Sequence, residues 1–575
     1  MTTATIDSDK FVRTPVPPGA RRGKAKPHPR GRRVPPAARA EVLGLLADRP
    51  RRRDLLIEHL HLIQDAYGHI SAAHLAALAE EMRLSPAEIY EVATFYAHFD
   101  VVRENETPPP PLTVRVCDGV ACEMQGGKEL LTALRAGLGR DGEADRVQVV
   151  RGPCMGRCDK GPVAAVGANY LTAATVETVE ATARAGETTE AVPTHIGFEA
   201  YRAAGGYRLL ADCLAGRRTV DEIVAALDDS GLRGLGGAGF PVGRKWRVVR
   251  EQPAPRLMAV NADEGEPGTF KDRHCLAGDP HRVIEGALVA AWAVEADEVY
   301  FYVRDEYPAI RALLAKALDE VAAASLARPV LHLRRGAGAY ICGEESAMME
   351  SIEGRRGLPR HRPPFAAEVG LFGRPTLINN VETLHWVRDI LERGADWFAA
   401  QGRNGRKGLR LYSVSGRVRD PGVKRAPVGI TMNELLAEHC GGMADGHVFR
   451  AYLPGGASGG ILPASLADIP LDFGSLEEHG ASIGSAAVIV LSDRDDMREV
   501  ALNAMRFFED ESCGQCTPCR VGTEKAAALM AEPEWNAELL EELCRCMADA
   551  SICGLGQAAP NAVRSILAHF PEDVS

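Results

Sequence analysis

The sequence predicts a multidomain protein of the α/β and α+β classes, and three observations support this. The chain has 575 residues, enough for roughly three to five domains of ordinary size. The spacing of apolar residues changes along the chain from helical to alternating and back to helical. Hydrophobic residues make up 46% and charged residues 25%, as in globular proteins, and no apolar run reaches the roughly 20 residues of a membrane span.

The first 36 residues are basic and rich in proline. Such a segment buries too little apolar surface to offset its ordering entropy, so we expect a disordered basic tail over 1–36. Docking on an acidic partner subunit is the alternative, followed by nucleic-acid binding or organelle targeting. No apolar N-terminal stretch suggests a secretory signal, so a cytoplasmic location is expected. The net charge of −11 gives no general reason to expect nucleic-acid binding.

Residues 37–106 are expected to form a small helical bundle. Ser71 and Ser85 occupy N-cap positions, and Pro86 occupies the first position of the helix that follows Ser85. The expected helices are 37–47, 52–66, 72–82 and 86–99. A proline-rich linker over 107–111 then separates the bundle from the next unit.

Residues 112–190 predict a small α/β domain, because strand and helix periodicities alternate. The expected order is strand 112–116, helix 125–138, strands 146–151 and 163–166, and helix 175–185. Two cysteine pairs follow the strands: Cys117 and Cys122 with C-x4-C spacing, and Cys154 and Cys158 with C-x3-C spacing. Four thiolates in two pairs can hold a [2Fe-2S] cluster or one zinc ion. Zinc sites more often use C-x2-C, so the spacing favours iron, with zinc or unrelated thiols as alternatives.

Residues 195–405 form the largest predicted unit, with strands at 257–260, 298–303 and 330–333 and helices at 282–294, 307–327 and 344–353. Its first glycine-rich loop, 234–239, matches G-x-G-x-x-G but follows a predicted helix, 220–227, instead of a strand. The loop is therefore either a structural turn or a cofactor loop. Phe240 and Trp246 nearby either stack on a cofactor ring or pack in the core.

Two further segments of this unit follow predicted strands. The loop 336–343 leads from a strand into the helix 344–353, the geometry that cradles phosphate at a helix N-terminus. Glu344 and Glu345 suit the helix dipole but would repel phosphate, so we expect them to face ribose hydroxyls or a nicotinamide. The segment 261–268 places four polar side chains at a strand end, as a ligand crevice or a capped surface turn.

The C-terminal third contains the strongest motif. Residues 406–492 are β-rich, with strands expected at 410–415 and 486–491, and 493–575 are helical. Cys513, Cys516 and Cys519 follow C-x2-C-x2-C spacing, which indicates three corners of a [4Fe-4S] cubane. The spacing leaves the fourth ligand open among Cys544, Cys546 and Cys553. The isolated cysteines, expected to be buried thiols, are Cys213, Cys275, Cys342 and Cys440.

Several motifs together resemble one known family. The segments 231–246, 261–273, 336–346, 376–383 and 511–520 look like the NADH-oxidising flavoprotein subunit of respiratory complex I. Residues 40–190 resemble its small thioredoxin-like [2Fe-2S] partner, here in the same chain. The resemblance implies a thioredoxin-like [2Fe-2S] domain over 112–190, a Rossmann-like FMN/NAD domain over 195–405, a ubiquitin-like (SLBB-type) β domain over 406–492 and a helical [4Fe-4S] domain over 493–575.

The resemblance also implies site residues. Those expected to line FMN are Gly234, Gly236, Gly237, Lys245, Asn261, Asp263, Glu264, Gly343, Glu344, Asn379 and Asn380. Those expected to hold NAD(H) are Phe240, Glu266, Glu345 and Phe365. The family pattern selects Cys553 as the fourth cubane ligand. The chain departs from the family at Leu235, where arginine is usual, at Arg362, which replaces a lysine, and at Val248, where an aromatic is common.

The fusion of both subunits in one chain resembles the diaphorase subunit of NAD-reducing hydrogenases. It resembles still more the beta subunit of cytosolic NAD-dependent molybdenum or tungsten formate dehydrogenases. The expected function is electron transfer between NAD and a catalytic alpha subunit that carries a Mo/W-pterin and further iron–sulfur clusters, with FMN converting between hydride and one-electron transfer. No catalytic side chain is expected. The alternatives are a hydrogenase diaphorase, a complex I module and, from another class, a zinc-stabilised binding scaffold.

Overall fold

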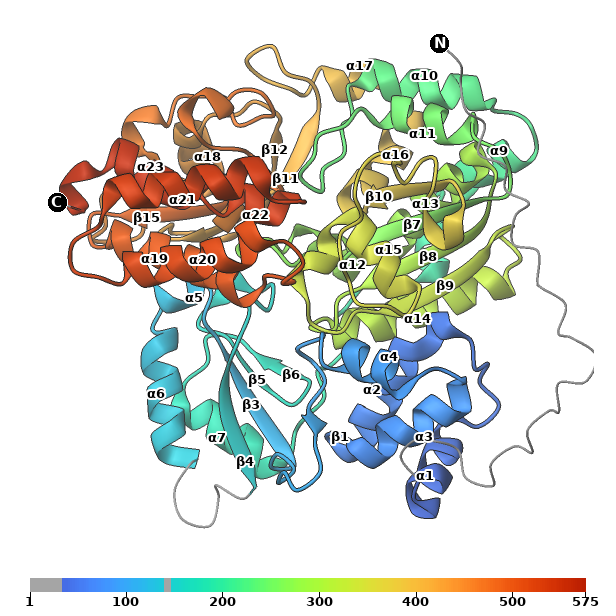
Figure 1. Ribbon diagram of the computed structural model, residues 1–575. Coiled ribbons are helices and arrows are strands. Elements are labelled where there is room, and N and C mark those ends of the chain that lie inside the picture. Colours follow the sequence, from blue (N-terminus) through green and yellow to red (C-terminus); the bar gives the residue numbers. More distant parts are fainter. Residues whose placement is uncertain (1–33, 139–145, 575) are drawn as a thin grey trace, which may run out of the picture.

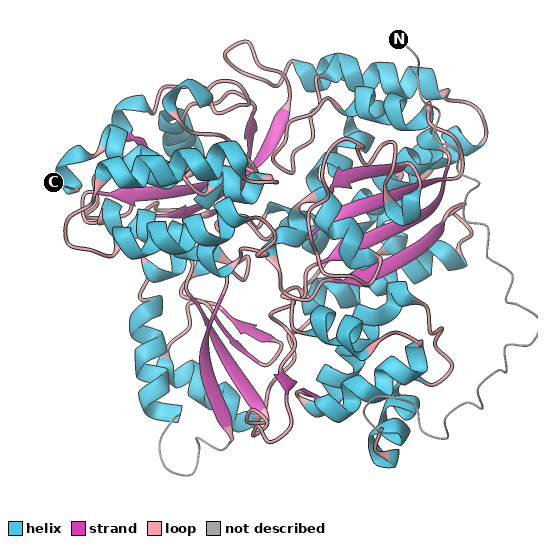
Figure 2. Ribbon diagram, in the orientation of Figure 1, coloured by secondary structure: helices cyan, strands magenta, loops and turns pink. Residues whose placement is uncertain are grey.

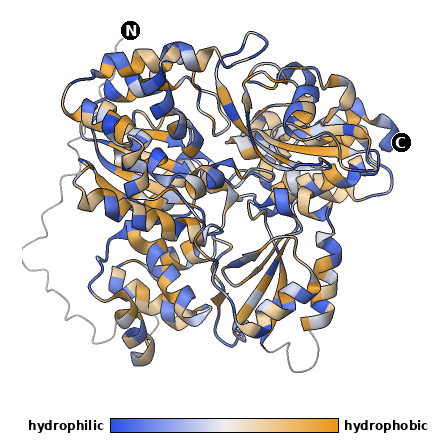
Figure 3. Cartoon of the chain, turned by 180° about the vertical axis from the view of Figure 1, so that it is seen from behind, coloured by the Kyte–Doolittle hydropathy of each residue, from blue (hydrophilic) through white to orange (hydrophobic). Residues whose placement is uncertain are grey.

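The computed structural model describes residues 34–138 and 146–574 (Figure 1). The predicted basic tail lies outside the described residues except for its last three, of which Pro36 begins the first helix. None of the helices within the described ranges is both long and apolar enough to cross a bilayer. Seen from behind, Figure 3 shows apolar residues gathered on the sheets and on the helices that cover them.

The N-terminal helices form the predicted bundle. They are α1 (Pro36–Leu46), α2 (Leu56–Tyr67), α3 (Ala72–Met82) and α4 (Pro86–Ala93), with a short parallel pair, β1 (Ile70–Ser71) and β2 (Val101–Val102). Ser71 and Ser85 cap α3 and α4 as predicted, because each hydroxyl accepts the backbone N–H three residues ahead. The prediction that the last helix reaches residue 99 is wrong. Instead, the N–H groups of Ala97 and His98 donate to carbonyls of a distant loop, those of Gly338 and Ala337.

The next domain is built on a mixed four-stranded sheet of order β4-β3-β5-β6. Its elements are β3 (Leu112–Cys117), α5 (Val120–Glu123), α6 (Gly127–Leu138), β4 (Val147–Gly152), β5 (Ala164–Val166), β6 (Asn169–Leu171) and α7 (Val176–Ala185). The predicted element order is confirmed, although α5 and β6 were missed. Leu130, Leu134 and Val179 pack the two long helices against Val114 and Val166 of the sheet.

The central domain contains a fully parallel sheet of order β10-β7-β8-β9 (Figure 2). Its strands are β7 (Arg256–Ala262), β8 (Ala296–Val303), β9 (Val330–Arg335) and β10 (Thr376–Asn380). The three predicted strands are confirmed, and β10 is additional. Because parallel strands end at the same edge, the segments after β7, β9 and β10 meet there.

Helices surround this sheet. They are α8 (Phe198–Ala203), α9 (Arg208–Leu214), α10 (Val220–Ser230), α11 (Val242–Arg250), α12 (Lys271–Gly278), α13 (Pro280–Val294), α14 (Pro308–Ala323), α15 (Glu345–Ile352), α16 (Val381–Arg393) and α17 (Ala395–Ala399). The glycine loop 234–239 lies between α10 and α11, so the helix predicted before it is confirmed.

The remaining chain combines a β domain with a helical region. The sheet has the order β12-β11-β15-β13-β14, with β11 (Leu409–Gly416), β12 (Gly422–Pro427), β13 (Phe449–Leu453), β14 (Leu462–Pro463) and β15 (Ala487–Ser492), and α18 (Met432–His439) joins two of its strands. The C-terminal helices are α19 (Met497–Asp510), α20 (Thr517–Met530), α21 (Ala537–Ala550), α22 (Gly554–Ala558) and α23 (Asn561–His569). Leu453 and Leu491 of the sheet share one buried core with Met505 and Ile566 of these helices.

Candidate redox site

Four cysteines meet where β3 and β4 end. Cys117 ends β3, Cys122 lies in α5, and Cys154 and Cys158 follow β4. All four side chains are buried, and the Sγ atoms of Cys154 and Cys158 are 3.3 Å apart. Hydrogen bonds with the thiols of Cys122 and Cys154 raise the pKa of Cys117. The structure therefore brings the two predicted pairs into one group, here called the sheet cysteines.

A second group, here called the helix cysteines, lines a small cavity between helix ends. Cys516 is the N-cap of α20, Cys519 lies in its first turn, and Cys553 is the N-cap of α22. Together with Cys513 they line the cavity. The partial positive charge at the start of α20 suits a group of thiolates.

The structure separates the three candidates for the fourth thiol, which the spacing left open. Cys553 lies in the cavity with the three motif cysteines. Cys544 is buried within α21, and Cys546 is exposed on the same helix. Neither of these two lines the cavity, so the geometry agrees with the choice of Cys553 that the family pattern implied.

A larger cavity of about 390 Å³ lies at the carboxyl edge of the parallel sheet. This volume lies within the range of small-molecule sites. The walls come from the central domain, the β domain and α22. The lining residues are Gly236, Gly237, Ala238, Asn261, Glu264, Gly265, Glu266, Thr269, Lys271, Asp272, Tyr340, Ile341, Gly343, Glu344, Asn380, Ser458, Ser482, Gly484, Ser485, Gly554, Leu555 and Ala558.

Strand register and glycine shape this cavity. Asn261 of β7 lies opposite Asn380 of β10, and its amide Nδ2 donates to the carbonyl of Gly343 at 2.9 Å. A Cβ at Gly236 would lie 3.1 Å from the Asn380 side chain, and Gly237 has a φ of +127°. Glycine suits this close approach and this backbone conformation, so the loop presents bare backbone to the cavity.

Seven of the eleven residues predicted for FMN line this cavity: Gly236, Gly237, Asn261, Glu264, Gly343, Glu344 and Asn380. The other four lie beside it. Gly234 closes the loop through its N–H to Phe240, and Asn379 accepts a hydrogen bond from Trp246 at 3.2 Å. Asp263 lines a smaller adjoining cavity, and Lys245 pairs with Glu345 at 3.8 Å.

The residues predicted for NAD(H) are spread more widely. Glu266 lines the large cavity, whereas the rings of Phe240 and Phe365 are 43% and 52% exposed. Glu345 pairs with Arg362 at 3.0 Å. Trp246, for which stacking on a cofactor was open, is fully buried in the core.

The carboxylates of Glu344 and Glu264, both predicted to line FMN, accept hydrogen bonds from protein groups. Glu344 caps α15 by accepting the N–H groups of Ser346 and Ala347, which is the structural role expected from the helix dipole. Glu264 accepts the backbone N–H of Arg273 at 2.9 Å and the hydroxyl of Tyr307 at 2.8 Å. Their carboxylates are thus engaged with protein groups.

Burial also raises the pKa of the Glu266 carboxyl. Desolvation raises the pKa of this carboxyl to about 7, although hydrogen bonds from the Tyr340 hydroxyl and the Ser458 N–H act in the opposite direction. The carboxyl is therefore partly protonated near neutral pH. This carboxyl links the central domain to the β domain, because Ser458 belongs to the latter.

A buried cation in this cavity was not predicted from the sequence. Lys271 is fully buried, 2.9 Å from Asp272 and 3.0 Å from Glu382. Burial alone would lower the pKa of Lys271, but the carboxylates of Asp272, Glu382 and Glu264 outweigh it and raise that pKa above its ordinary value. The only sequence signal was an adjacent pair of opposite charges directly after Phe270, inside a segment assigned to the family motif.

The helix cysteines adjoin the large cavity, and the sheet cysteines are connected to it through Arg304. Ile341 and Leu555 line it and also line the cavity of the helix cysteines. On the other side, the buried Arg304 donates through Nη1 to the carbonyl of Glu264 at 2.8 Å and through Nη2 to the carbonyl of Cys154 at 2.7 Å. A ligand cavity connected to two four-cysteine groups is typical of a redox protein of the iron–sulfur class.

Comparison with known families agrees with this class. Residues 43–186 match the thioredoxin-like [2Fe-2S] ferredoxin family, and 227–389 match the Nuo51 FMN-binding domain. Residues 411–462 match the SLBB domain, and 499–575 match the NADH-ubiquinone oxidoreductase-F iron–sulfur binding region. The predicted fold class is confirmed, as are binding domains for FMN, a [2Fe-2S] cluster and a [4Fe-4S] cluster.

Comparison with individual proteins identifies the family of the flavoprotein part. The chain is 43% identical over 395 residues to an NADH-quinone oxidoreductase subunit of Rhizobium meliloti, an alignment that covers 66% of this chain and 94% of the relative. It is 40% identical over 372 residues to the mitochondrial NADH-ubiquinone oxidoreductase 51 kDa subunit of Neurospora crassa, covering 61% and 76%. The chain belongs to this family of NADH-quinone and NADH-ubiquinone oxidoreductase flavoproteins, with a thioredoxin-like [2Fe-2S] domain joined to it.

One solved structure extends the similarity over nearly the whole chain. A chain of the air-oxidised NAD+-reducing [NiFe]-hydrogenase superposes with a TM-score of 0.80 at 33% identity, covering 92% of this chain and 94% of that chain. None of these three relatives is a formate dehydrogenase, so the similarity does not show the predicted formate dehydrogenase context.

Proposed function

We propose that this chain is the NAD(H)-reactive electron-transfer subunit of a multisubunit oxidoreductase. The observation that carries the proposal is the cavity at the sheet edge, which adjoins the helix cysteines and is connected to the sheet cysteines through Arg304. FMN, when bound, exchanges two electrons with NAD(H) as hydride and single electrons with iron–sulfur clusters. The activity proposed for the chain is NADH:acceptor oxidoreduction.

The residues of this chain would bind and orient the cofactors. We assign FMN to the cavity, where the glycine loop leaves room for the ring system and Lys271 supplies a fixed positive charge. Asn261 and Asn380 offer amide groups from the two strand ends. Phe240 and Phe365, being exposed, are available to stack on the bases of NAD(H), with Glu266 and Glu345 accepting from ribose hydroxyls.

We assign a [2Fe-2S] cluster to the sheet cysteines and a [4Fe-4S] cluster to the helix cysteines. Burial, thiol chemistry and spacing all fit these groups. The walls shared with the flavin cavity support the helix cysteines as its direct neighbour. The sheet cysteines, linked to it through the backbone of Cys154 and through Arg304, suit a side relay or electron store.

The identity of the partner subunit rests on the fused architecture. The similarity to a chain of an NAD+-reducing [NiFe]-hydrogenase extends over both the thioredoxin-like and the flavoprotein parts, which favours a hydrogenase-type diaphorase. A formate dehydrogenase is the second candidate, and only the resemblance of the fused chain to formate dehydrogenase beta subunits supports it. In that case the partner would be an alpha subunit that carries a Mo/W-pterin. A complex I module is favoured by the identity to the Rhizobium meliloti subunit.

Elemental analysis of the complex, purified anaerobically from its native host, tests these assignments. We expect about six iron atoms from this chain, besides those of its partners. Nickel with iron supports the hydrogenase assignment, and molybdenum or tungsten supports formate dehydrogenase. A chain that binds no iron and no flavin, and that does not reduce artificial acceptors with NADH, would contradict the proposed function.

A further inference from the structure

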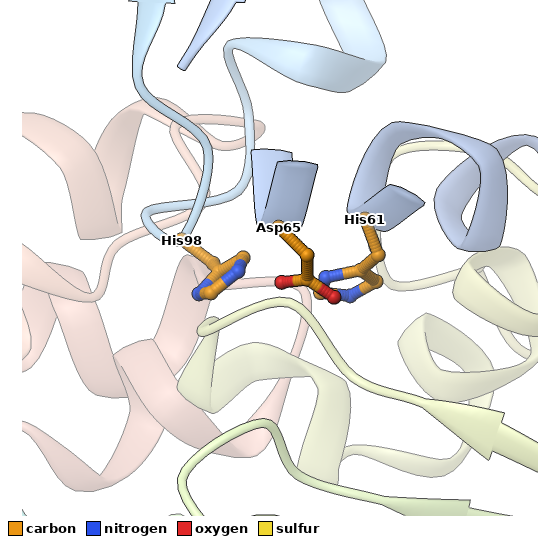
Figure 4. Close-up of side chains that lie close together, drawn as sticks. All are labelled: His61, Asp65 and His98. Carbon is orange, nitrogen blue, oxygen red and sulfur yellow. The ribbon is translucent and has the colours of Figure 1, made fainter. Parts of the chain in front are cut away.

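A cluster of potential metal ligands lies where the helical bundle meets the central domain (Figure 4). His61 and Asp65 are four residues apart on α2 and therefore share one face of the helix. His98 comes from the segment after α4. One ligand atom from each of these residues lies within 4.8 Å of the others. Figure 4 shows the Asp65 carboxylate beside the His61 ring, and the two imidazole rings themselves lie with their centroids 4.9 Å apart.

Hydrogen bonds fix the tautomer of each imidazole. Nε2 of His61 lies 3.0 Å from the carbonyl oxygen of Gly336, which can only accept, so this nitrogen carries the proton. Nδ1 of His61 therefore presents a lone pair, and it is buried without a hydrogen-bond partner. Nδ1 of His98 donates in the same way to the Asp305 carboxylate at 2.7 Å, which leaves Nε2 with a lone pair. Metal-binding histidines have one nitrogen held by a carbonyl or carboxylate and the other turned to the metal. Here Nδ1 of His61 is free, whereas Nε2 of His98 has Nη2 of Arg335 at 3.5 Å, a contact that an ion would replace.

The charge in the cluster is balanced by arginine. Arg335 contacts Asp65 at 2.5 Å and Asp305 at 2.6 Å, and its Nη2 lies 3.5 Å from Nε2 of His98. Arg311 lies 3.7 Å from Asp305. The Asp65 side chain is 53% exposed, so it can turn from the guanidinium toward an ion that enters from solvent. Arg335 would keep its hydrogen bond to Asp305.

We propose that His61, Asp65 and His98 form a binding site for a divalent transition-metal ion, with zinc as the best match. Two imidazole nitrogens and one carboxylate oxygen suit zinc, with water completing the coordination, and they do not suit magnesium or calcium. The ion would tie α2 to the segment after α4. Both lie on the loop after β9, because Gly336 holds His61 and the carbonyls of Ala337 and Gly338 hold the segment that bears His98. That loop leads to Tyr340 and Ile341 of the flavin cavity.

Zinc titration of the full chain, carrying its flavin and iron–sulfur clusters, tests the site after gel filtration has removed loosely bound metal. We expect one zinc ion per chain whose X-ray absorption spectrum shows nitrogen and oxygen neighbours with two imidazoles. Asp65→Asn changes an exposed side chain, so it should fold while losing most of the affinity. Asp305→Asn should weaken binding by about 10–100-fold, since it removes the group that orients His98.

His69→Gln is the matched control, because His69 belongs to the same bundle and its ring bonds only locally, to the carbonyl of Tyr67. The His69→Gln variant should bind zinc like the unaltered chain. Zinc should raise the midpoint of thermal unfolding of these two proteins but not that of Asp65→Asn. Sulfur neighbours in the spectrum would place the zinc at cysteines and overturn the proposal. So would the absence of stoichiometric binding, or equal affinity of Asp65→Asn and His69→Gln. Arg335 would then be the cation of this cluster. These outcomes do not depend on the proposed electron transfer.

Discussion

The two cysteine groups are built in opposite ways. The sheet cysteines are buried and come from the end of β3, from α5 and from the segment after β4, around parallel strand ends. Three of the helix cysteines lie at helix starts and Cys513 lies in the loop before α20, and three of the four are only partly buried. The first group is fixed by a sheet and reaches the flavin cavity through Arg304, whereas the second shares two wall residues with that cavity. The group closer to the proposed flavin cavity is thus the more exposed one, and the group farther from it is the better protected from solvent.

The largest effect is expected from Cys516→Ser. If the helix cysteines are the flavin's neighbour, NADH should still bleach the flavin, but electron transfer to the partner subunit should be abolished, because one cluster ligand is lost. Stopped-flow absorbance with NADH and a partner-reduction assay measure the two steps separately. Cys546→Ser, on an exposed residue outside the cavity, is the control. Unimpaired transfer in Cys516→Ser would reverse the assigned roles of the two groups.

Arg304→Ala should act on the sheet cysteines. The variant leaves Glu306 without its partner at 2.9 Å and two buried carbonyls without a donor. Breaking a buried pair in this way costs about 3–5 kcal/mol of unfolding free energy. Denaturant unfolding measures the loss, with the exposed Arg217→Ala as control. Potentiometric titration followed by electron paramagnetic resonance should show a lower potential for the [2Fe-2S] cluster alone, and equal shifts in both clusters would contradict the separation.

Iron removal should distinguish the groups by their burial. A chelator should first extract about four of about six iron atoms, because Cys513, Cys516 and Cys553 are partly exposed and the sheet cysteines are not. Local opening suffices for the first site, whereas the second needs its domain to unfold. The time course of iron release, followed by chelator absorbance, should have two phases. A single phase would show that burial does not protect the sheet cysteines.

The smallest effect is expected from pH. The pKa of Glu266 is about 7 in the folded chain and near 4.5 when exposed, so the folded state binds more protons between these values. Unfolding free energy should therefore fall as pH rises from about 5 to 7. Glu266→Gln should flatten this slope in flavin-free protein, as measured by denaturant unfolding at several pH values. An unchanged slope would show that Glu266 is ionised in the fold.

Many helices and strands could be predicted, because the sequence patterns that indicate them involve residues close together in the chain. The caps at Ser71 and Ser85 and the strands at 257–260 and 298–303 depend on residues close in sequence. The end of α4 could not be predicted, because the donors of Ala97 and His98 are taken by carbonyls far away in the chain. The formate dehydrogenase context depended on a partner that this chain does not contain.

Local sequence was sufficient for the cysteine spacings, the element order and the family, since each is a pattern of neighbouring residues. Folding in three dimensions determines which distant groups share a site. It places Cys553 with the three motif cysteines, Asn261 opposite Asn380, and Lys271 among three carboxylates. It also brings His98 to His61 and Asp65. The family resemblance had already grouped Cys553 with the motif cysteines and Asn261 with Asn380, although spacing alone had not. The surroundings of Lys271 and the meeting of His98 with His61 and Asp65 were not predicted, because strand register and helix packing determine which distant side chains meet.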